Sequence, residues 1–70
     1  MKHFVVIVYQ GLFQDFDLAQ EFTDEEEARA FARSRNQACA LVVQGTVDDW
    51  YTQRLGMPLV VYCYGAEFHR

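Results

Sequence analysis

The sequence has few of the residues on which several classes of protein depend. Its 70 residues include two cysteines, one proline and four glycines. Two cysteines do not make a disulfide framework, and we expect Cys39 and Cys63 to be buried, inert thiols of a protein in a reducing cytosol. Four scattered glycines and a single proline leave no linker and no glycine-rich loop for phosphate.

Long apolar runs are also lacking. No stretch approaches the roughly 20 apolar residues that a membrane-spanning helix needs. The run Phe4–Val8 follows a single lysine, Lys2, and is too short for the apolar region of a signal peptide. We therefore expect a cytoplasmic protein that makes no contact with a membrane.

Basic residues are outnumbered by acidic ones. Six Lys and Arg stand against ten Asp and Glu, which gives a formal net charge of -4. Because nucleic acids attract proteins through contacts between phosphates and cations, we expect no direct binding of nucleic acid. A protein of this charge suits partners with a basic surface, including proteins that hold nucleic acid in a basic groove.

The acidic residues that are present gather in one segment. Seven of the ten carboxylates lie between Asp15 and Glu27, and no Lys or Arg interrupts them. Their density predicts a local negative field that acts on a partner, although runs of charge also occur as solvated faces. In a strand over 15–22, the first three would project from one side. The residues that we assign to partner binding are Asp15, Asp17, Glu21, Asp24, Glu25, Glu26 and Glu27.

The order of the segments predicts a single α+β domain over residues 1–70. Thr23 and Glu26 match a capping box, so we expect a helix that begins at Thr23 and stops near Asn36. Runs of β-branched and aromatic residues, or residues that alternate with period two, predict four strands. These strands are expected at 4–9, 15–22, 38–44 and 58–64. The pattern is β-β-α-β-β, a four-stranded antiparallel sheet with one main helix on one face.

One helix covers only one face of such a sheet, so the other face needs a cover. The strands at 4–9 and 58–64 carry apolar or aromatic residues on both faces. We favour a short helical turn that begins near Thr46 within the segment 46–57. Either this segment folds over the second face or that face meets another molecule.

Four aromatic residues are secondary candidates for an interface, where Trp and Tyr are enriched. They are Trp50, Tyr51, Tyr62 and Tyr64. Trp50 has a competing assignment, which we favour, as a core residue that plugs the second face of the sheet. A chain this short needs its large side chains to fill its interior.

The residues that catalysis or metal binding requires do not form a recognised pattern. His3 and His69 could meet beside Glu67 if the first and last strands were neighbours, but their spacing carries no metal signature. There is no nucleophile beside a base and no zinc spacing. We therefore expect no enzyme, no catalytic residue, no metal and no cofactor.

The first half of the chain resembles a group of short phage and mobile-element proteins. The resemblance is carried by the hairpin of Phe4–Tyr9 and Asp15–Phe22 and by the helix that follows, Thr23-Asp24-Glu25-Glu26-Glu27-Ala28-Arg29-Ala30-Phe31-Ala32. Some members of this group are anti-CRISPR proteins, which are small, often acidic inhibitors that bind a surveillance complex and can block its DNA-binding surface. The resemblance implies a phage-type inhibitor that mimics DNA.

The sequence thus predicts a non-catalytic binding protein whose acidic face engages a basic groove of a protein machine such as a CRISPR effector. One alternative is a homodimeric structural or regulatory module, in which the open sheet face with Tyr9, Tyr62 or Tyr64 forms the interface. A second alternative is a small enzyme or ligand sensor with a pocket between the sheet and the segment 46–57.

Overall fold

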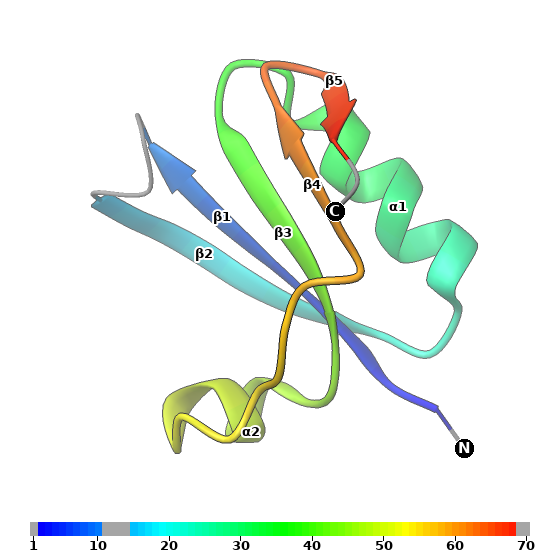
Figure 1. Cartoon of the computed structure of the whole chain (residues 1–70), viewed down its shortest axis with the longest axis vertical. Coiled ribbons are helices and arrows are strands. Elements are labelled where there is room, and N and C mark those ends of the chain that lie inside the picture. The colour runs from blue at the N-terminus through cyan, green and yellow to red at the C-terminus, as the bar shows by residue number, and fades with distance from the viewer. Residues whose placement is uncertain (1, 11–14, 69–70) are drawn as a thin grey trace.

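The computed structural model describes residues 2–10 and 15–68, with only the backbone over 15–17. Five strands form one antiparallel sheet in the order β2-β1-β3-β4-β5, and two helices lie against its faces (Figure 1). The elements in chain order are β1 (Phe4–Gln10), β2 (Asp15–Phe22), α1 (Glu25–Ser34), β3 (Cys39–Gln44), α2 (Val47–Tyr51), β4 (Val60–Cys63) and β5 (Ala66–Phe68). The predicted α+β class and the antiparallel sheet are confirmed.

The sheet has one strand more than the sequence pattern indicated. The expected strand at 58–64 is shorter, because the chain reverses at Tyr64 and Gly65, with φ of 53° and 84°. Two consecutive residues with positive φ make the tight turn that suits a two-residue hairpin. Tyrosine is not a typical residue for such a turn. The apolar run over 58–64 therefore predicted one continuous strand and gave no sign of the hairpin to β5.

The larger hydrophobic core lies between the sheet and α1. Here β1 is buried because it has β2 on one side, β3 on the other and α1 above it. The buried members of this core are Phe4, Val6, Val8, Ala28, Ala32, Ala38, Ala40, Val42, Val60 and Tyr62. Small alanines on α1 let the helix approach the sheet closely, and Phe22 and Phe31 seal the side of the core with ring centroids 5.3 Å apart.

The second face of the sheet has a smaller core, which the α2 segment covers. Val47, Trp50 and Leu55 pack against the buried side chains of Val5 and its neighbours on β1 and β3. The helix expected in 46–57 is confirmed, and so is the core assignment of Trp50. Gly45 permits this packing, since its φ is 146° and a Cβ there would collide with the Leu55 side chain.

The start of α1 differs by one residue from the sequence-based expectation. Asp24, not Thr23, is the N-cap, and its carboxylate accepts a hydrogen bond of 3.0 Å from the backbone N–H of Glu26. The predicted capping box at Thr23 and Glu26 is therefore wrong. Both residue types cap helices well. Asp24 is the cap here because its backbone is extended while the residues after it are helical.

This cap gives a test with a matched control. Asp24→Ala is expected to lower the free energy of unfolding by about 1 kcal/mol, because the N–H of Glu26 loses its acceptor. Thr23→Ala, one residue earlier and also exposed, is expected to change it little. Urea unfolding followed by circular dichroism measures both, and a larger loss in Thr23→Ala would contradict the assignment.

Candidate functional site

Both helices begin at the same end of the sheet. Phe4 pairs with Phe22 on β2 and with Gln44 on β3, so these three residues form one row across the sheet. The first residue of α1 is three positions after Phe22, and the first residue of α2 is three positions after Gln44. The two helix N-termini therefore lie beyond the same row, one on each face (Figure 1).

This arrangement gathers most of the negative charge of the chain. The first turn of each helix is acidic, and β2 carries a further carboxylate just before Phe22. We call this region the acidic end, and its seven carboxylates are those of Glu21, Asp24, Glu25, Glu26, Glu27, Asp48 and Asp49. Sequence reasoning had left out the two acids of α2, because joining them to α1 requires knowledge of the pairing between β1 and β3.

The first two acids of the predicted set lie elsewhere. Asp15 pairs with Gln10 at the opposite end of β2, roughly 20 Å from Phe22 at the usual rise per residue. The register also shifts, since Tyr9 pairs with Phe16 and Val8 pairs with Leu18, which leaves Asp17 without a partner across the strands. The period-two alternation predicted along 15–22 is thus interrupted by a bulge.

Glu21 links three segments at the acidic end. One of its carboxylate oxygens accepts a hydrogen bond of 3.0 Å from the backbone N–H of Val47, at the start of α2. The other oxygen lies 2.9 Å from Nδ1 of His3, a contact that is an ion pair when the imidazole is protonated and that lacks the geometry of a hydrogen bond. Glu21 thereby ties β2 to α2 and to the chain preceding β1.

Two aspartates of the acidic end act as helix caps. Asp24 caps α1, as described above. On α2, Thr46 and Asp49 form a capping box, in which each side chain accepts a hydrogen bond of 3.0 Å from the backbone N–H of the other residue. These carboxylates satisfy N–H groups that a helix leaves unpaired, so they serve folding whatever else they do.

Glu25 belongs to a network that crosses from α1 to β5. Its carboxylate lies 2.8 Å from Nε of Arg29, and the same guanidinium lies 3.4 Å from Glu67. The hydroxyl of Tyr62 donates a hydrogen bond to Glu67. Burial, and secondly this hydrogen bond, raises the pKa of Tyr62, whereas hydrogen bonding to Glu25 raises the pKa of Arg29. The guanidinium therefore stays charged and offsets Glu25.

Three acids of the acidic end have no such role in the described part of the chain. Glu26, Glu27 and Asp48 are exposed, and no described Lys, Arg or His side chain pairs with any of them. The partial positive charge at each helix N-terminus stabilises them by roughly 0.3–1 kcal/mol each, which explains why they are tolerated together. Their charges face solvent and are available to a partner.

The aromatic candidates divide according to burial. Tyr62 is 1% exposed and faces the α1 side, so its predicted place on an open interface is wrong. Trp50 is half-buried against the second face. Tyr51 and Tyr64 are 66% and 58% exposed, and they remain on the surface. The Tyr51 ring packs edge-on against Trp50, with centroids 4.8 Å apart.

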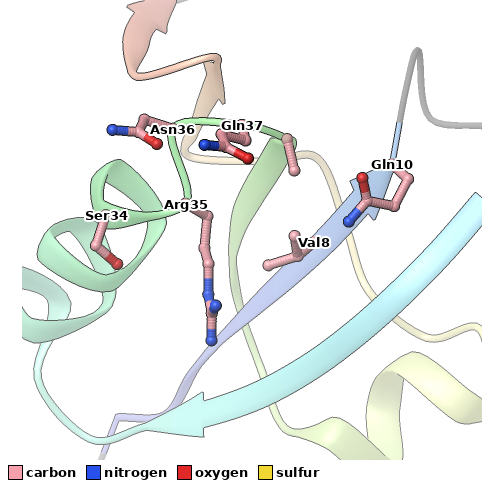
Figure 2. Close-up of a pocket in the computed structure, with 7 residues that line it drawn as sticks. Val8, Gln10, Ser34, Arg35, Asn36 and Gln37 are labelled. Atoms are coloured by element: carbon pink, nitrogen blue, oxygen red, sulfur yellow. The ribbon is translucent and has the colours of Figure 1, made fainter.

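A cavity of about 280 Å³ lies on the α1 side of the sheet, between the C-terminal end of α1 and β1 (Figure 2). Its lining residues are Val8, Gln10, Ser34, Arg35, Asn36, Gln37 and Ala38. Arg35 also stacks on the ring of Phe31 at 4.7 Å. These lining residues offer amides, the Ser34 hydroxyl and one guanidinium but no carboxylate, imidazole or thiol, so the cavity suits hydrogen bonding better than acid–base chemistry. The pocket expected for a small enzyme or ligand sensor was predicted at a different place, between the sheet and the segment 46–57.

Residues 2–10 and 15–68 were expected to hold neither a metal site nor a membrane-spanning helix. No group of three or more His, Cys, Asp and Glu side chains there could hold a metal ion. His3 contacts Glu21, β3 separates β1 from β4, and His69 lies outside the described residues. Neither α1 nor α2 is long and apolar enough to cross a membrane.

Comparison of this chain with protein-family models, with curated proteins and with solved structures finds no match. The arguments for function therefore start from the positions and contacts of its own residues. Among these, the acidic end holds more charged side chains in one place than any other described surface feature, and the cavity beside Arg35 is a second feature with several polar side chains in its lining.

The buried phenol predicts a pH dependence of stability. The pKa of Tyr62 is raised in the folded protein, so its stabilising contribution is complete below the ordinary tyrosine pKa near 10 and is lost as the pH rises further. We expect the free energy of unfolding to fall above that pH, and Tyr62→Phe to reduce the fall. Exposed Tyr51→Phe is the matched control and should keep the wild-type slope. Urea unfolding at a series of alkaline pH values checks this, and identical slopes in both variants would refute it.

Proposed function

We propose that this chain is a non-catalytic binding protein whose acidic end engages the basic, nucleic-acid-binding surface of a partner protein. The observation that supports the proposal is the meeting of two acidic helix starts at one end of the sheet. Seven of ten carboxylates lie there, and only Arg29 and His3 pair with any of them in the described chain. A surface of this kind attracts cationic partners through its summed field.

The nature of the free acids favours a protein partner over a metal ion. Glu26 and Glu27 extend from α1 on one face of the sheet, whereas Asp48 extends from α2 on the other. Carboxylates spread in this way across the end of a sheet do not converge on one point, as the ligands of a cation must. They suit several separate lysine or arginine side chains, such as those that line a groove for nucleic acid.

In its concrete form, the proposal makes the chain a phage-type inhibitor that occupies the nucleic-acid site of a machine such as a CRISPR effector. This form rests on the resemblance of the N-terminal half to such inhibitors. The acidic end adds a physical reason, because carboxylates in a basic groove take the place of phosphates and so exclude the nucleic acid by competition.

A competition experiment tests the acidic end. The purified chain is added to nucleic-acid-binding complexes, a CRISPR effector among them, that hold a fluorescent oligonucleotide, and displacement is measured at low and high salt. Glu27→Gln with Asp48→Asn removes one free acid from each helix without touching a cap. We expect this pair to weaken displacement roughly ten-fold at low salt and to flatten its salt dependence.

The matched control removes two charges at the other end of β2. Asp15→Asn with Asp17→Asn has the same effect on net charge but leaves the acidic end intact. This pair is expected to displace the oligonucleotide nearly as well as the wild type. Equal losses in the two pairs would mean that net charge alone matters, and no displacement by the wild-type chain from any complex would reject the proposal.

A second candidate function, a homodimeric module, is favoured by a part of the second sheet face that α2 does not cover. Leu41, Val61 and Cys63 are half-buried there, and Phe68 on the edge strand β5 is 55% exposed. A second copy of the chain is an occupant that is always present with it. Because the surface is apolar, the contact between two copies would be largely insensitive to salt. Sedimentation velocity distinguishes the candidates: a salt-independent dimer that Phe68→Asp dissociates supports the module, and a monomer at all concentrations excludes it.

A further inference from the structure

The two cysteines occupy directly opposite positions on neighbouring strands. Cys39 on β3 pairs with Cys63 on β4. The backbone N–H of Tyr64 donates a hydrogen bond of 3.1 Å to the carbonyl of Ala38, so residues 38 and 64 form a hydrogen-bonded pair. In an antiparallel ladder the next pair, 39 with 63, is then a non-hydrogen-bonded pair, whose Cα atoms lie about 4.5 Å apart.

This spacing allows a disulfide without movement of the strands. Disulfides join residues whose Cα atoms are about 4.4–6.8 Å apart, and the non-hydrogen-bonded pair lies at the lower limit of that range. Both cysteines are free thiols in the structure. Burial, and secondly interaction with the neighbouring Cys63 thiol, raises the pKa of Cys39 to about 11.

The two thiols differ in access. Cys39 is fully buried, whereas Cys63 is half-buried in the uncovered part of the second face, next to the turn at Tyr64 and Gly65. A small reagent therefore reaches Cys63 first. The buried thiol is then in place to attack whatever becomes attached to its neighbour.

We propose that Cys39 and Cys63 form a reversible redox site that a low-molecular-weight disulfide, such as oxidised glutathione, closes. The Cys63 thiolate attacks one sulfur of the glutathione disulfide, which forms a mixed disulfide and releases one glutathione thiolate. The Cys39 thiolate then attacks Sγ of Cys63, which forms the Cys39–Cys63 bond and releases the second glutathione. Two protein thiols are oxidised, one glutathione disulfide is reduced, and both thiol protons end on the released glutathione molecules.

Closure would act on the segment that carries Asp48 and Asp49, two of the seven carboxylates of the acidic end. The covalent ring encloses residues 40–62, which include α2 with its capping box and Asp48. A bond across β3 and β4 restricts the excursions of this segment in the unfolded chain and so stabilises the folded state.

The test uses the reduced full chain and oxidised glutathione. Mass spectrometry is expected to show a monomer that has lost two hydrogen atoms, with a melting temperature higher by several degrees. Dithiothreitol should restore the original mass and melting temperature. The second step, attack by Cys39 on the mixed disulfide, should accelerate as the pH rises toward the raised pKa of Cys39, because the attacking thiolate becomes more abundant.

Two variants separate the steps. Cys39→Ala keeps the accessible thiol and is expected to stop at the mixed disulfide, with one glutathione attached at Cys63. Cys63→Ala leaves only the buried thiol and is expected to remain unmodified. Three results with the wild-type chain would each overturn the proposal: a stable glutathione adduct that never closes, disulfide-linked dimers, or no reaction at all.

Discussion

The position of every charged group at the acidic end depends on the pairing of β1 with β2 on one side and β3 on the other. Residues 4–8 of β1 are buried on both faces of the sheet. Because side chains alternate between faces, a slip of one residue against β3 would exchange the residues that face α1 with those that face α2. The burial of this strand therefore decides that Phe22 and Gln44 share a row, and hence that both helices begin at the same end.

Seven carboxylates can share one end of a small domain because the fold supplies compensation. Backbone N–H groups at the two helix starts donate hydrogen bonds to three of these carboxylates, those of Asp24, Asp49 and Glu21. Arg29 offsets Glu25. These four acids thus stabilise the fold. A partner could bind them only by breaking the hydrogen bonds or the ion pair that they make within the chain. The argument for function falls on the acids that remain, whose charge is tolerated by the helix dipoles but satisfies no N–H or cation in the described chain.

Sequence patterns predicted the features that depend on residues close together in the chain. They missed the features that depend on how the strands pair. The strand at 15–22, the helix that follows it and the core role of Trp50 come from periodicity and burial demand, and all were predicted. The hairpin to β5 was not, because Tyr64 occupies a turn conformation in which glycine or asparagine is usual. The inclusion of Asp48 in the site, and the bulge at Asp17, follow from the register between strands, which no local pattern reveals.

The stability of the acidic end is unequal between its two halves. α1 is anchored by two fully buried alanines and closes the main core, whereas α2 has no buried residue and rests on half-buried contacts from Val47 and Trp50. Segments with few buried contacts open at the lowest free energy, so α2 should open before α1 does. Its cap at Thr46 and the hydrogen bond from Val47 to Glu21 are then the interactions that hold Asp48 in register with the acids of α1. A covalent bond between β3 and β4 would close residues 40–62, α2 among them, into a ring, and so would disfavour the unfolding of the segment that carries Asp48.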